Sequence, residues 1–346
     1  MSRAVVLIPL AAIFISVLAI GWLRNSRINV IEVSQEARFA FATWKKVYGR
    51  QYKSPQEDGY RMMSFYKNFL MVKNHNEPTY EVALNKFADL TQEEFRAKYL
   101  SAPQKAPENN LPGVLPRDPK LDAIKDIPAT WDWRSKGAVQ SVKDQGECKS
   151  SYAFAAVSAF ESASFINGYS LYDMSEQQIL DCSGAVGTLG CNGGYPQQGL
   201  NYIYTSNGLQ SETTYPYTGV KGKCSVTNSS ILPPKTNGYY FTLQNNCTDL
   251  QIAIVREPVA VDIDALSITF YKSGVFSTTK CGTTREHAVS VVGYGTDSQS
   301  GKNYWIVKNS WGVSWGEQGY IRMDRDVQQP VGICGICVIA YYPHIY

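Results

Sequence analysis

The chain has 346 residues, of which 44% are hydrophobic and 18% are charged. This composition is typical of a globular protein with two or three folding units, and it excludes a chain that is disordered by composition. The formal net charge of +3 and the isoelectric point near 8.3 are too mild to predict nucleic acid or an anionic membrane as a partner.

The N-terminus has the pattern of a secretory signal. An uncharged apolar run over residues 4–23 follows Arg3, and small residues before Trp22 offer a cleavage site. We therefore predict a signal peptide over residues 1–21. The run is also long enough to span a bilayer, so an uncleaved signal anchor is the alternative, and only that form would associate with a membrane. Either form predicts the secretory pathway, with a lysosomal, vacuolar or extracellular destination.

Residues 33–99 have the pattern of a small helical unit. Apolar side chains such as Phe39, Trp44 and Phe65 recur there at helical intervals among mixed charges. Residues 103–128 then contain six prolines. Helices do not continue through such a stretch, and exposed linkers are where proteases cut. We predict a prosegment with a processing site in this linker; a small helical domain with an ordinary linker is the alternative.

The rest of the chain changes from a helical to a β-rich pattern. Residues 151–166 carry many Ala, Phe and Val with no Gly or Pro, which is consistent with a central buried helix. From about residue 258, β-rich runs at 288–294, 304–307 and 320–323 are separated by turns that contain glycine. Pattern alone predicts an α+β protein with two lobes.

Cysteines and sequons indicate an oxidising environment. All eight cysteines follow residue 147. An even number behind a signal predicts a disulfide framework, although spacing alone cannot choose among 105 pairings. Sequons at Asn228 and Asn246 predict glycosylation on surface loops. We expect no cofactor and no metal.

Six separated motifs resemble those of one protein family and occur in its order. Residues 145–154, Gln-Gly-Glu-Cys-Lys-Ser-Ser-Tyr-Ala-Phe, resemble the active-site segment of papain-family cysteine peptidases, Gln-Gly-x-Cys-Gly-x-Cys-Trp-Ala-Phe. Residues 285–289 and 308–316 are similar to the family's histidine and asparagine segments, and residues 190–196 to its glycine-rich cleft wall. The ERFNIN helix of cathepsin L-type propeptides is matched, with valine for isoleucine, by Glu57, Arg61, Phe65, Asn68, Val72 and Asn76, and the GNFD motif, with alanine for glycine, by Ala83, Asn85, Phe87 and Asp89.

This resemblance to cathepsin L-like enzymes implies a papain-like α+β fold, in which a helical lobe and a β-barrel-like lobe meet at a cleft behind a helical inhibitory prosegment. It implies a propeptide inhibitor domain with its linker at residues 22–125 and a mature peptidase domain at residues 126–346. The expected partners are a peptide or protein in the cleft and the chain's own propeptide as inhibitor. A monomer is expected.

The resemblance also implies disulfides and cleft residues. It pairs Cys148 with Cys191, Cys182 with Cys224 and Cys281 with Cys334, and it leaves Cys247 and Cys337 either as a fourth bridge or as two free thiols. The implied substrate-binding residues are Gly193, Gly194, Tyr195, Pro196, Asp262, Glu286, Trp311 and Ile339. If Asp262 and Arg285 face each other, their ion pair would narrow the specificity pocket; alternatively, both side chains point to solvent.

Ser151 falls where the family has its nucleophilic cysteine. In the family, the helix N-terminus and a histidine lower the thiol pKa to about 3–4, so that the thiolate is preformed. An alcohol is a far weaker acid, and Ser151 would have to give its proton to the histidine during attack. Among the three histidines, His75 lies in the predicted prosegment and His344 almost at the C-terminus, which leaves His287 as the base.

Asn309 and Gln145 complete the expected site. Asn309 would orient the His287 ring, but serine hydrolases place a carboxylate there, and an amide in its place costs about 10⁴ in rate. The side-chain amide of Gln145 and the backbone N–H of Ser151 should still polarise a carbonyl, and such donors can support a residual rate of about 10³–10⁴ over water.

The difference at residue 151 is not isolated, because Lys149 stands for the usual glycine and Tyr152 for the usual tryptophan, which indicates natural divergence. One interpretation is a cathepsin L-like zymogen with weak or no peptidase activity. A second is a pseudopeptidase whose cleft binds peptides or inhibitors without cutting them. A third is a silicatein-like protein, because silicateins, cathepsin L relatives that promote silica condensation, share Ser-Tyr-Ala-Phe at residues 151–154, although the serine-rich clusters expected of that group are not evident.

Overall fold

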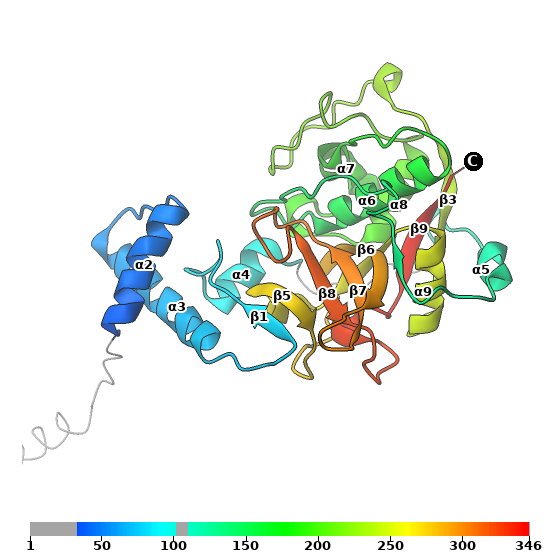
Figure 1. The fold of residues 1–346 in the computed structure, drawn as a ribbon. Coiled ribbons are helices and arrows are strands. Elements are labelled where there is room, and N and C mark those ends of the chain that lie inside the picture. The colour runs from blue at the N-terminus through cyan, green and yellow to red at the C-terminus, as the bar shows by residue number, and fades with distance from the viewer. Residues whose placement is uncertain (1–32, 102–109, 346) are drawn as a thin grey trace, which may run out of the picture. The chain divides into compact units, whose positions relative to one another are not determined.

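The structure, a computed structural model, describes residues 33–101 and 110–345. The predicted signal at residues 1–21 lies outside the described residues. Within the described part of the chain, no helix has the length and apolar character needed to cross a membrane. The chain divides into two compact units, one within residues 1–51 and one from residue 52 onward, and each is described by itself (Figure 1).

The described part of the first unit holds helix α2 (Gln35–Val47). The side chain of Ser34 accepts a hydrogen bond from the Ala37 backbone N–H at 3.2 Å, which caps the first turn. The rings of Phe41 and Trp44, three residues apart on one face, stack with their centroids 6.1 Å apart. Capping and this apolar face together explain why the segment is helical.

The second unit begins with the remainder of the prosegment, namely α3 (Pro55–Lys73), β1 (Tyr80–Val82) and α4 (Gln92–Tyr99). Two side chains of the ERFNIN pattern hold α3 to α4 and to the segment before α4. Arg61 Nη1 lies 2.8 Å from Glu94 Oε2, and Asn68 Nδ2 donates to the carbonyls of Ala88 and Leu90 at 2.9 and 2.8 Å. The helical pattern had not predicted β1, which pairs with β5 (Tyr271–Phe276) and is therefore fixed by a distant segment.

The linker is partly docked and contains a short helix, α5 (Pro119–Ala123), which was not predicted. Pro119 is compatible with a first helical turn, and Asp118 caps it. Before this helix, the Leu115 backbone N–H donates to the Tyr239 carbonyl at 2.9 Å and the Tyr239 N–H donates to the Gly113 carbonyl at 2.8 Å. Gly113, Asp118 and Leu121 are buried, whereas Pro119 and Lys120 are exposed, so the linker is docked at some residues and accessible at others.

The helical lobe is built around α6 (Ser151–Ile166), whose residues 151–164 are all buried, as the sequence predicted. Helices α7 (Glu176–Cys182) and α8 (Pro196–Thr205), with the short 3₁₀ turns η1 (Ser183–Val186) and η2 (Gly190–Asn192), accompany it. In Figure 1 these helices gather in green beside the strands of the other lobe. A Cβ at Gly199 of α8 would lie 2.7 Å from the Ala156 Cβ, so small residues allow the two helices to approach closely.

The other lobe is a sheet of nine strands, counted over the described residues, in the order β1-β5-β8-β7-β6-β4-β9-β3, with β2 paired to β6. The strands not yet given bounds are β2 (Trp131–Asp132), β3 (Thr236–Phe241), β4 (Val259–Ile263), β6 (His287–Thr296), β7 (Asn303–Lys308), β8 (Tyr320–Asp324) and β9 (Ala340–Ile345). The remaining helix of this half of the sequence is α9 (Cys247–Arg256), and its short 3₁₀ turns are η3 (Asn228–Ser230), η4 (Leu266–Ile268) and η5 (Ile333–Gly335). The strands β6, β7 and β8 contain the three predicted β-rich runs. The mixed helical and sheet lobes confirm the predicted papain-like α+β architecture.

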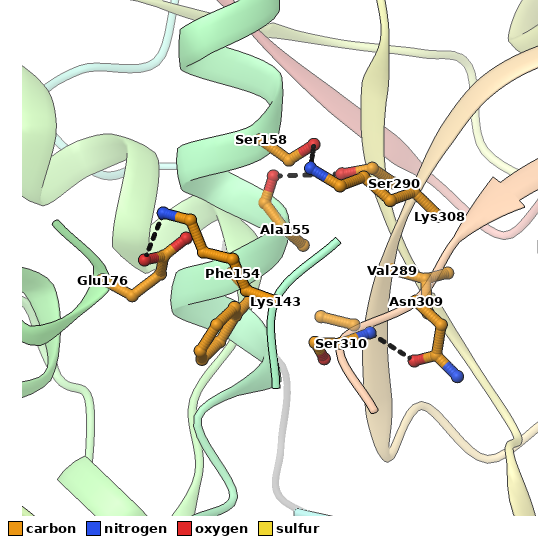
Figure 2. A pocket seen from close by; sticks show the side chains of 11 residues that line it. Lys143, Phe154, Ala155, Ser158, Glu176, Val289, Ser290, Lys308, Asn309 and Ser310 are labelled. Atoms are coloured by element: carbon orange, nitrogen blue, oxygen red, sulfur yellow. Dashed lines mark hydrogen bonds and ion pairs between the residues drawn. The ribbon is translucent and has the colours of Figure 1, made fainter. Parts of the chain in front are cut away.

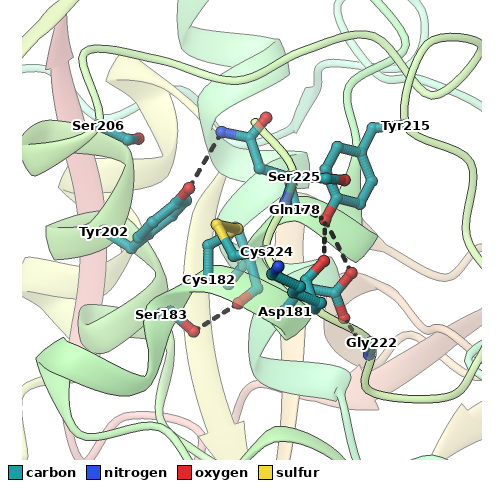
Figure 3. The surroundings of a disulfide bond; sticks show 12 residues. Gln178, Asp181, Cys182, Ser183, Tyr202, Ser206, Tyr215, Gly222, Cys224 and Ser225 are labelled. Carbon is teal, nitrogen blue, oxygen red and sulfur yellow. Dashed lines mark hydrogen bonds between the residues drawn. A yellow bond between two sulfur atoms is a disulfide. The ribbon is translucent and has the colours of Figure 1, made fainter. Parts of the chain in front are cut away.

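Four disulfides join the eight cysteines, in the pairs Cys148–Cys191, Cys182–Cys224, Cys281–Cys334 and Cys247–Cys337. The last pair decides the alternative that the sequence left open. Figure 3 shows the surroundings of Cys182–Cys224, where the Asp181 carboxylate accepts hydrogen bonds from the Tyr215 hydroxyl at 2.9 Å and the Gly222 backbone N–H at 2.6 Å. The disulfide and these bonds tie the loop around Gly222 to α7.

The two sequons lie at structurally different places. Asn228 begins the 3₁₀ turn η3. Asn246 is the N-cap of α9, and its Oδ1 accepts from the Asp249 backbone N–H at 2.9 Å. This cap leaves the Asn246 side-chain nitrogen, the atom to which a glycan would be attached, outside the helix hydrogen bond.

Candidate active site

Ser151 is the first residue of α6 and is only 1% exposed. Its Oγ accepts a hydrogen bond from the Ala288 backbone N–H at 3.1 Å. The neighbouring Ser150 hydroxyl is engaged elsewhere, since it lies 2.6 Å from the Tyr217 hydroxyl, which donates to the Gln145 carbonyl at 2.8 Å. Of the two adjacent serines, Ser151 is therefore the one whose side chain reaches β6.

His287 and Asn309 are brought together by the pairing of β6 with β7. His287 is the first residue of β6 and Asn309 follows the last residue of β7, and the register places Ser290 opposite Lys308. The imidazole Nε2 of His287 lies 2.8 Å from Asn309 Oδ1. If Nε2 carries the proton and donates to this oxygen, Nδ1 holds the free lone pair. The ring also packs on Trp311, with centroids 4.7 Å apart.

Nothing in the described part of the chain hydrogen-bonds to His287 Nδ1, which is buried. The hydroxyl of Ser151 therefore makes no hydrogen bond to the ring, although its partner Ala288 is the next residue. Burial lowers the pKa of His287 to about 4, because the imidazolium loses its hydration, and the hydrogen bond with Asn309 opposes this only in part. The neutral form of the ring therefore predominates at neutral pH.

Gln145 is fully buried, and its side-chain amide is fully engaged. The Nε2 atom donates to the Cys148 carbonyl at 2.9 Å and to the Tyr99 carbonyl of the prosegment at 3.1 Å, while Oε1 accepts from the Ser310 hydroxyl at 2.7 Å. The Tyr99 carbonyl of the prosegment thus occupies the Gln145 side-chain donor that we expected to polarise a substrate carbonyl.

The prosegment covers this site through aromatic and backbone contacts. The rings of Phe87 and Phe95 lie edge-on to Trp311, with centroids 5.5 and 5.3 Å away, and Tyr99 packs on both. Beyond α4, the Ser101 backbone N–H donates to the Glu286 carbonyl at 2.8 Å. Ser151 and His287 are buried in the presence of these contacts.

The predicted specificity pocket contains an ion pair. Asp262 is buried, and its Oδ2 lies 2.6 Å from Arg285 Nη2. The Arg285 guanidinium also lies over the Tyr195 ring, 5.0 Å from its centroid. Of the two alternatives left by the sequence, the facing arrangement is the one observed. Ile339 is buried and packs with the core of the helical lobe.

The glycine-rich wall gives the prosegment room. Gly193 has a φ of +116°, and a Cβ there would lie 2.6 Å from Ser101 Oγ. Next to it, a Cβ at Gly194 would lie 3.1 Å from the Tyr152 ring. Pro196 follows as the first residue of α8. Backbone conformation and close approach therefore both require glycine at residue 193.

A buried charged cluster beside α6 was not predicted from the sequence. Figure 2 shows Lys143 and Lys308 around a cavity of about 20 Å³, which is room for about one water. Lys143 Nζ lies 2.8 Å from Glu176 Oε2, and Lys308 Nζ donates to Ser158 Oγ at 3.5 Å. Burial raises the pKa of the Glu176 carboxyl to about 8 and lowers that of Lys308. The one hint of this cluster in the sequence is Lys308, a charged residue directly after the apolar run 304–307.

No group of histidine, cysteine, aspartate or glutamate side chains suited to hold a metal ion occurs within residues 33–101 and 110–345.

Comparison with known proteins agrees with this fold and site. Residues 127–344 match the family profile described as papain family cysteine protease, and residues 41–95 match the cathepsin propeptide inhibitor domain. The chain is 37% identical to ananain of Ananas comosus over 337 residues, which are 94% of this chain and 93% of ananain. It is 40% identical to the oryzain beta chain of Oryza sativa subsp. japonica over 319 residues, which are 89% of this chain but only 66% of that relative.

Solved structures of precursors are similar over almost the same length. The precursor of recombinant stem bromelain matches with a TM-score of 0.79 and 39% identity, over 90% of this chain and 99% of that one. Procathepsin L 3 of the Tenebrio molitor larval midgut matches with a TM-score of 0.79 and 35% identity, over 90% of this chain and all (100%) of that one. The chain therefore belongs to the papain family of cysteine proteases and carries a cathepsin propeptide inhibitor domain.

Proposed function

We propose that this protein binds peptides in a papain-type cleft and that Ser151 does not act as a nucleophile to cut them. Residues 145–154 resemble the family's active-site segment and support Ser151 as the residue at the nucleophile position. The observation that carries the proposal is the arrangement of Ser151 and His287. The serine hydroxyl is bonded to the Ala288 N–H, and His287 Nδ1, which would have to take its proton, has no partner among the described residues.

The electrostatics of the site argue against proton transfer from serine. An activated serine needs a hydrogen-bonded base, and the base needs a group that stabilises the imidazolium formed during attack. His287 has a pKa lowered to about 4 by burial, and its neighbour Asn309 is a neutral amide. Displacement of the prosegment would hydrate the ring, but it would leave Asn309 in place.

The same contacts support the prosegment as the inhibitor of its own cleft. We assign residues 22–125 to the propeptide with its linker and residues 126–346 to the mature domain. The hydrogen bonds of the Tyr99 carbonyl to Gln145 and of the Ser101 N–H to the Glu286 carbonyl support this assignment, because both use residues of the proposed peptide-binding cleft. In keeping with the N-terminal apolar run, we propose that the protein acts in a lysosome or vacuole or outside the cell.

A slow serine peptidase is the second candidate. One observation favours it: the Gln145 side-chain amide donates to a carbonyl at 3.1 Å, so the donor that would polarise a substrate carbonyl is in position. The Ser151 hydroxyl would then need to turn from Ala288 toward His287 in a substrate complex.

Peptide binding with recovery of the peptide tests the proposal. The chain is cut at its linker by an added protease, the prosegment is displaced, and fluorescent peptides are titrated while their anisotropy is recorded. We expect saturable binding and, after prolonged incubation, intact peptides by mass spectrometry. Peptides that fail to bind, or that are recovered as defined fragments absent from a Ser151→Ala control, would contradict the proposal.

A further inference from the structure

Glu286, the residue before His287, has a completely buried carboxyl group with few partners. Its side chain is 0% exposed. Among the described residues, neither carboxyl oxygen accepts a hydrogen bond of standard geometry, and the Ala265 backbone N–H gives the carboxylate only weak support. Its one ion pair within the described residues is with Arg96, whose Nη1 lies 3.0 Å from Glu286 Oε2. A buried carboxylate with so little hydrogen bonding requires a counter-ion, and Arg96 supplies the largest stabilisation of its charged form.

The counter-ion of Glu286 belongs to the prosegment. Arg96 lies on α4, which the aromatic packing of Phe95 and Tyr99 holds against the cleft. When the prosegment is displaced, Glu286 loses this cation. The neighbouring carboxylate Asp262 differs, because its partner Arg285 lies in the same lobe and stays with it.

The other ion pairs that residues 52–101 of the prosegment make with the mature part are more exposed. Lys98 pairs with Glu147 at 2.9 Å, but the glutamate side chain is 59% exposed, and water can replace its partner. Asp144, the partner of Lys86, is 45% exposed. Of the carboxylates Asp144, Glu147 and Glu286, only Glu286 is fully shielded from water in the zymogen, where it faces a cation of the prosegment.

Backbone and side chain of Glu286 face the same incoming chain. Its carbonyl accepts the Ser101 N–H while its carboxylate pairs with Arg96. Burial raises the pKa of the carboxyl to about 7, which Arg96 opposes and the nearby Asp264 carboxylate increases. The negative charge of Asp264 adds to the attraction for a cation at this place.

From this arrangement we propose that Glu286 forms a cation subsite of the cleft, which Arg96 fills in the zymogen and a guanidinium or ammonium side chain of a bound peptide fills after the prosegment leaves. The inference rests on the proposed peptide-binding function and adds a ligand class to it: peptides with Arg or Lys at the position that reaches Glu286. The Glu286 carbonyl would accept a backbone N–H of the same peptide.

The first test uses the full chain. Arg96→Ala removes the cation and leaves a space into which N-ethylguanidinium can bind, with ethylurea as the neutral probe of similar shape. We expect N-ethylguanidinium at millimolar concentration to raise the unfolding temperature of Arg96→Ala and ethylurea to have no such effect. The double variant Arg96→Ala with Glu286→Gln should not respond to either probe. Equal responses to both probes, or an unchanged response in the double variant, would overturn a cation site at Glu286.

The second test uses the chain cut at its linker with the prosegment displaced. A peptide with arginine scanned along its length is compared with the same peptide carrying citrulline, a neutral isostere. At one position, we expect the arginine peptide to bind at least about tenfold more tightly, and Glu286→Gln to abolish the difference, since a buried ion pair is broken. The matched control Glu147→Gln should keep the preference.

The two tests separate the inference from the function on which it rests. Equal binding of arginine and citrulline peptides at all positions would overturn the basic ligand class and leave the peptide-binding function standing. Binding of neither peptide would overturn both, while the response of Arg96→Ala to N-ethylguanidinium still decides whether Glu286 is a cation site.

Discussion

At the scale of single residues, the site combines a neutral nucleophile candidate with a neutral base. Ser151 Oγ accepts a hydrogen bond from the Ala288 backbone N–H, and Nε2 of His287 is hydrogen-bonded to the amide oxygen of Asn309. In the family's chemistry, a preformed thiolate makes an imidazolium stable beside it. Here no charge compensates for the burial of His287, and its pKa falls to about 4. The protonation of this ring is therefore linked to folding.

This linkage predicts a pH dependence of zymogen stability. The pKa of His287 is about 4 in the folded protein, below the ordinary histidine value of 6.5. Between these values the unfolded chain binds more protons, so this contribution is present above about pH 6.5 and is lost as pH falls toward 4. It amounts to about 3 kcal/mol from the difference in pKa. His287→Asn should remove that part of the slope in unfolding titrations, whereas the Ser151→Ala control keeps it; identical slopes in all three proteins would refute the linkage.

The ion pair in the specificity pocket predicts opposite effects of single and double substitutions. Arg285→Ala leaves buried Asp262 without its cation and should lower the free energy of unfolding by about 3–5 kcal/mol. Replacing both residues by valine removes both charges and should restore most of the loss. Chemical denaturation of the three proteins measures this. A double variant no more stable than Arg285→Ala would show that the pair is not the cause.

At the scale of elements, strand pairing positions the site. The register of β6 against β7 brings His287 to Asn309, and the start of α6 brings Ser151 to β6. The linker is also held by an element, because Arg117 makes two hydrogen bonds to Asp249 of α9 at 2.7 and 3.1 Å. Docking of this segment on β3 and α9 is expected to protect it from proteases until it opens locally.

Arg117→Ala should therefore expose the docked part of the linker. Without its bonds to Asp249, the segment around Leu115 opens more often, and cleavage there by a protease with broad specificity should accelerate about tenfold. Mass spectrometry of the early fragments locates the cuts. Arg134→Ala, which removes an ion pair with Asp132 elsewhere on the surface, is the control and should not change the rate. Equal rates in both variants would mean that Arg117 does not hold the linker.

Elements with a strong local pattern could be predicted from the sequence, and elements fixed by distant contacts could not. The absence of Gly and Pro from residues 151–166 was enough to predict α6. Strand β1 and the docked linker depend on β5 and β3, which no local pattern reveals. Within the site, residue types indicated which side chains gather. The bond of Ser151 to Ala288 and the pairing of Glu286 with Arg96 depend on side-chain directions and packing.

At the scale of the second unit, from residue 52 onward, disulfides and the covered cleft hold the two lobes together with α3, β1 and α4 of the prosegment. The disulfide Cys247–Cys337 joins the start of α9 to the segment before β9 and encloses a sequence separation of 90 residues. Closing a long loop reduces the freedom of the unfolded chain, and a disulfide typically contributes 2–4 kcal/mol. Ile339 lies two residues beyond this bridge, so the bridge also restrains the pocket side of the helical lobe.

Replacing both Cys247 and Cys337 by serine should lower the unfolding free energy by about 2–4 kcal/mol. The measurement is equilibrium denaturation under oxidising conditions, with thiol titration of the unfolded protein to show that the other bridges have formed. A loss below about 0.5 kcal/mol with intact remaining bridges would contradict a stabilising role.

The proposed function depends on whether the Ser151 hydroxyl attacks peptide bonds. The most direct test is hydrolysis of basic and apolar fluorogenic peptides at acidic pH by the chain cut at its linker, comparing wild type, Ser151→Ala and Ser151→Cys. We predict equal rates for wild type and Ser151→Ala, and a rate at least about 100-fold higher for Ser151→Cys, because a thiolate needs no proton transfer during attack. A wild-type rate about tenfold or more above that of Ser151→Ala would contradict the account and establish a working serine nucleophile.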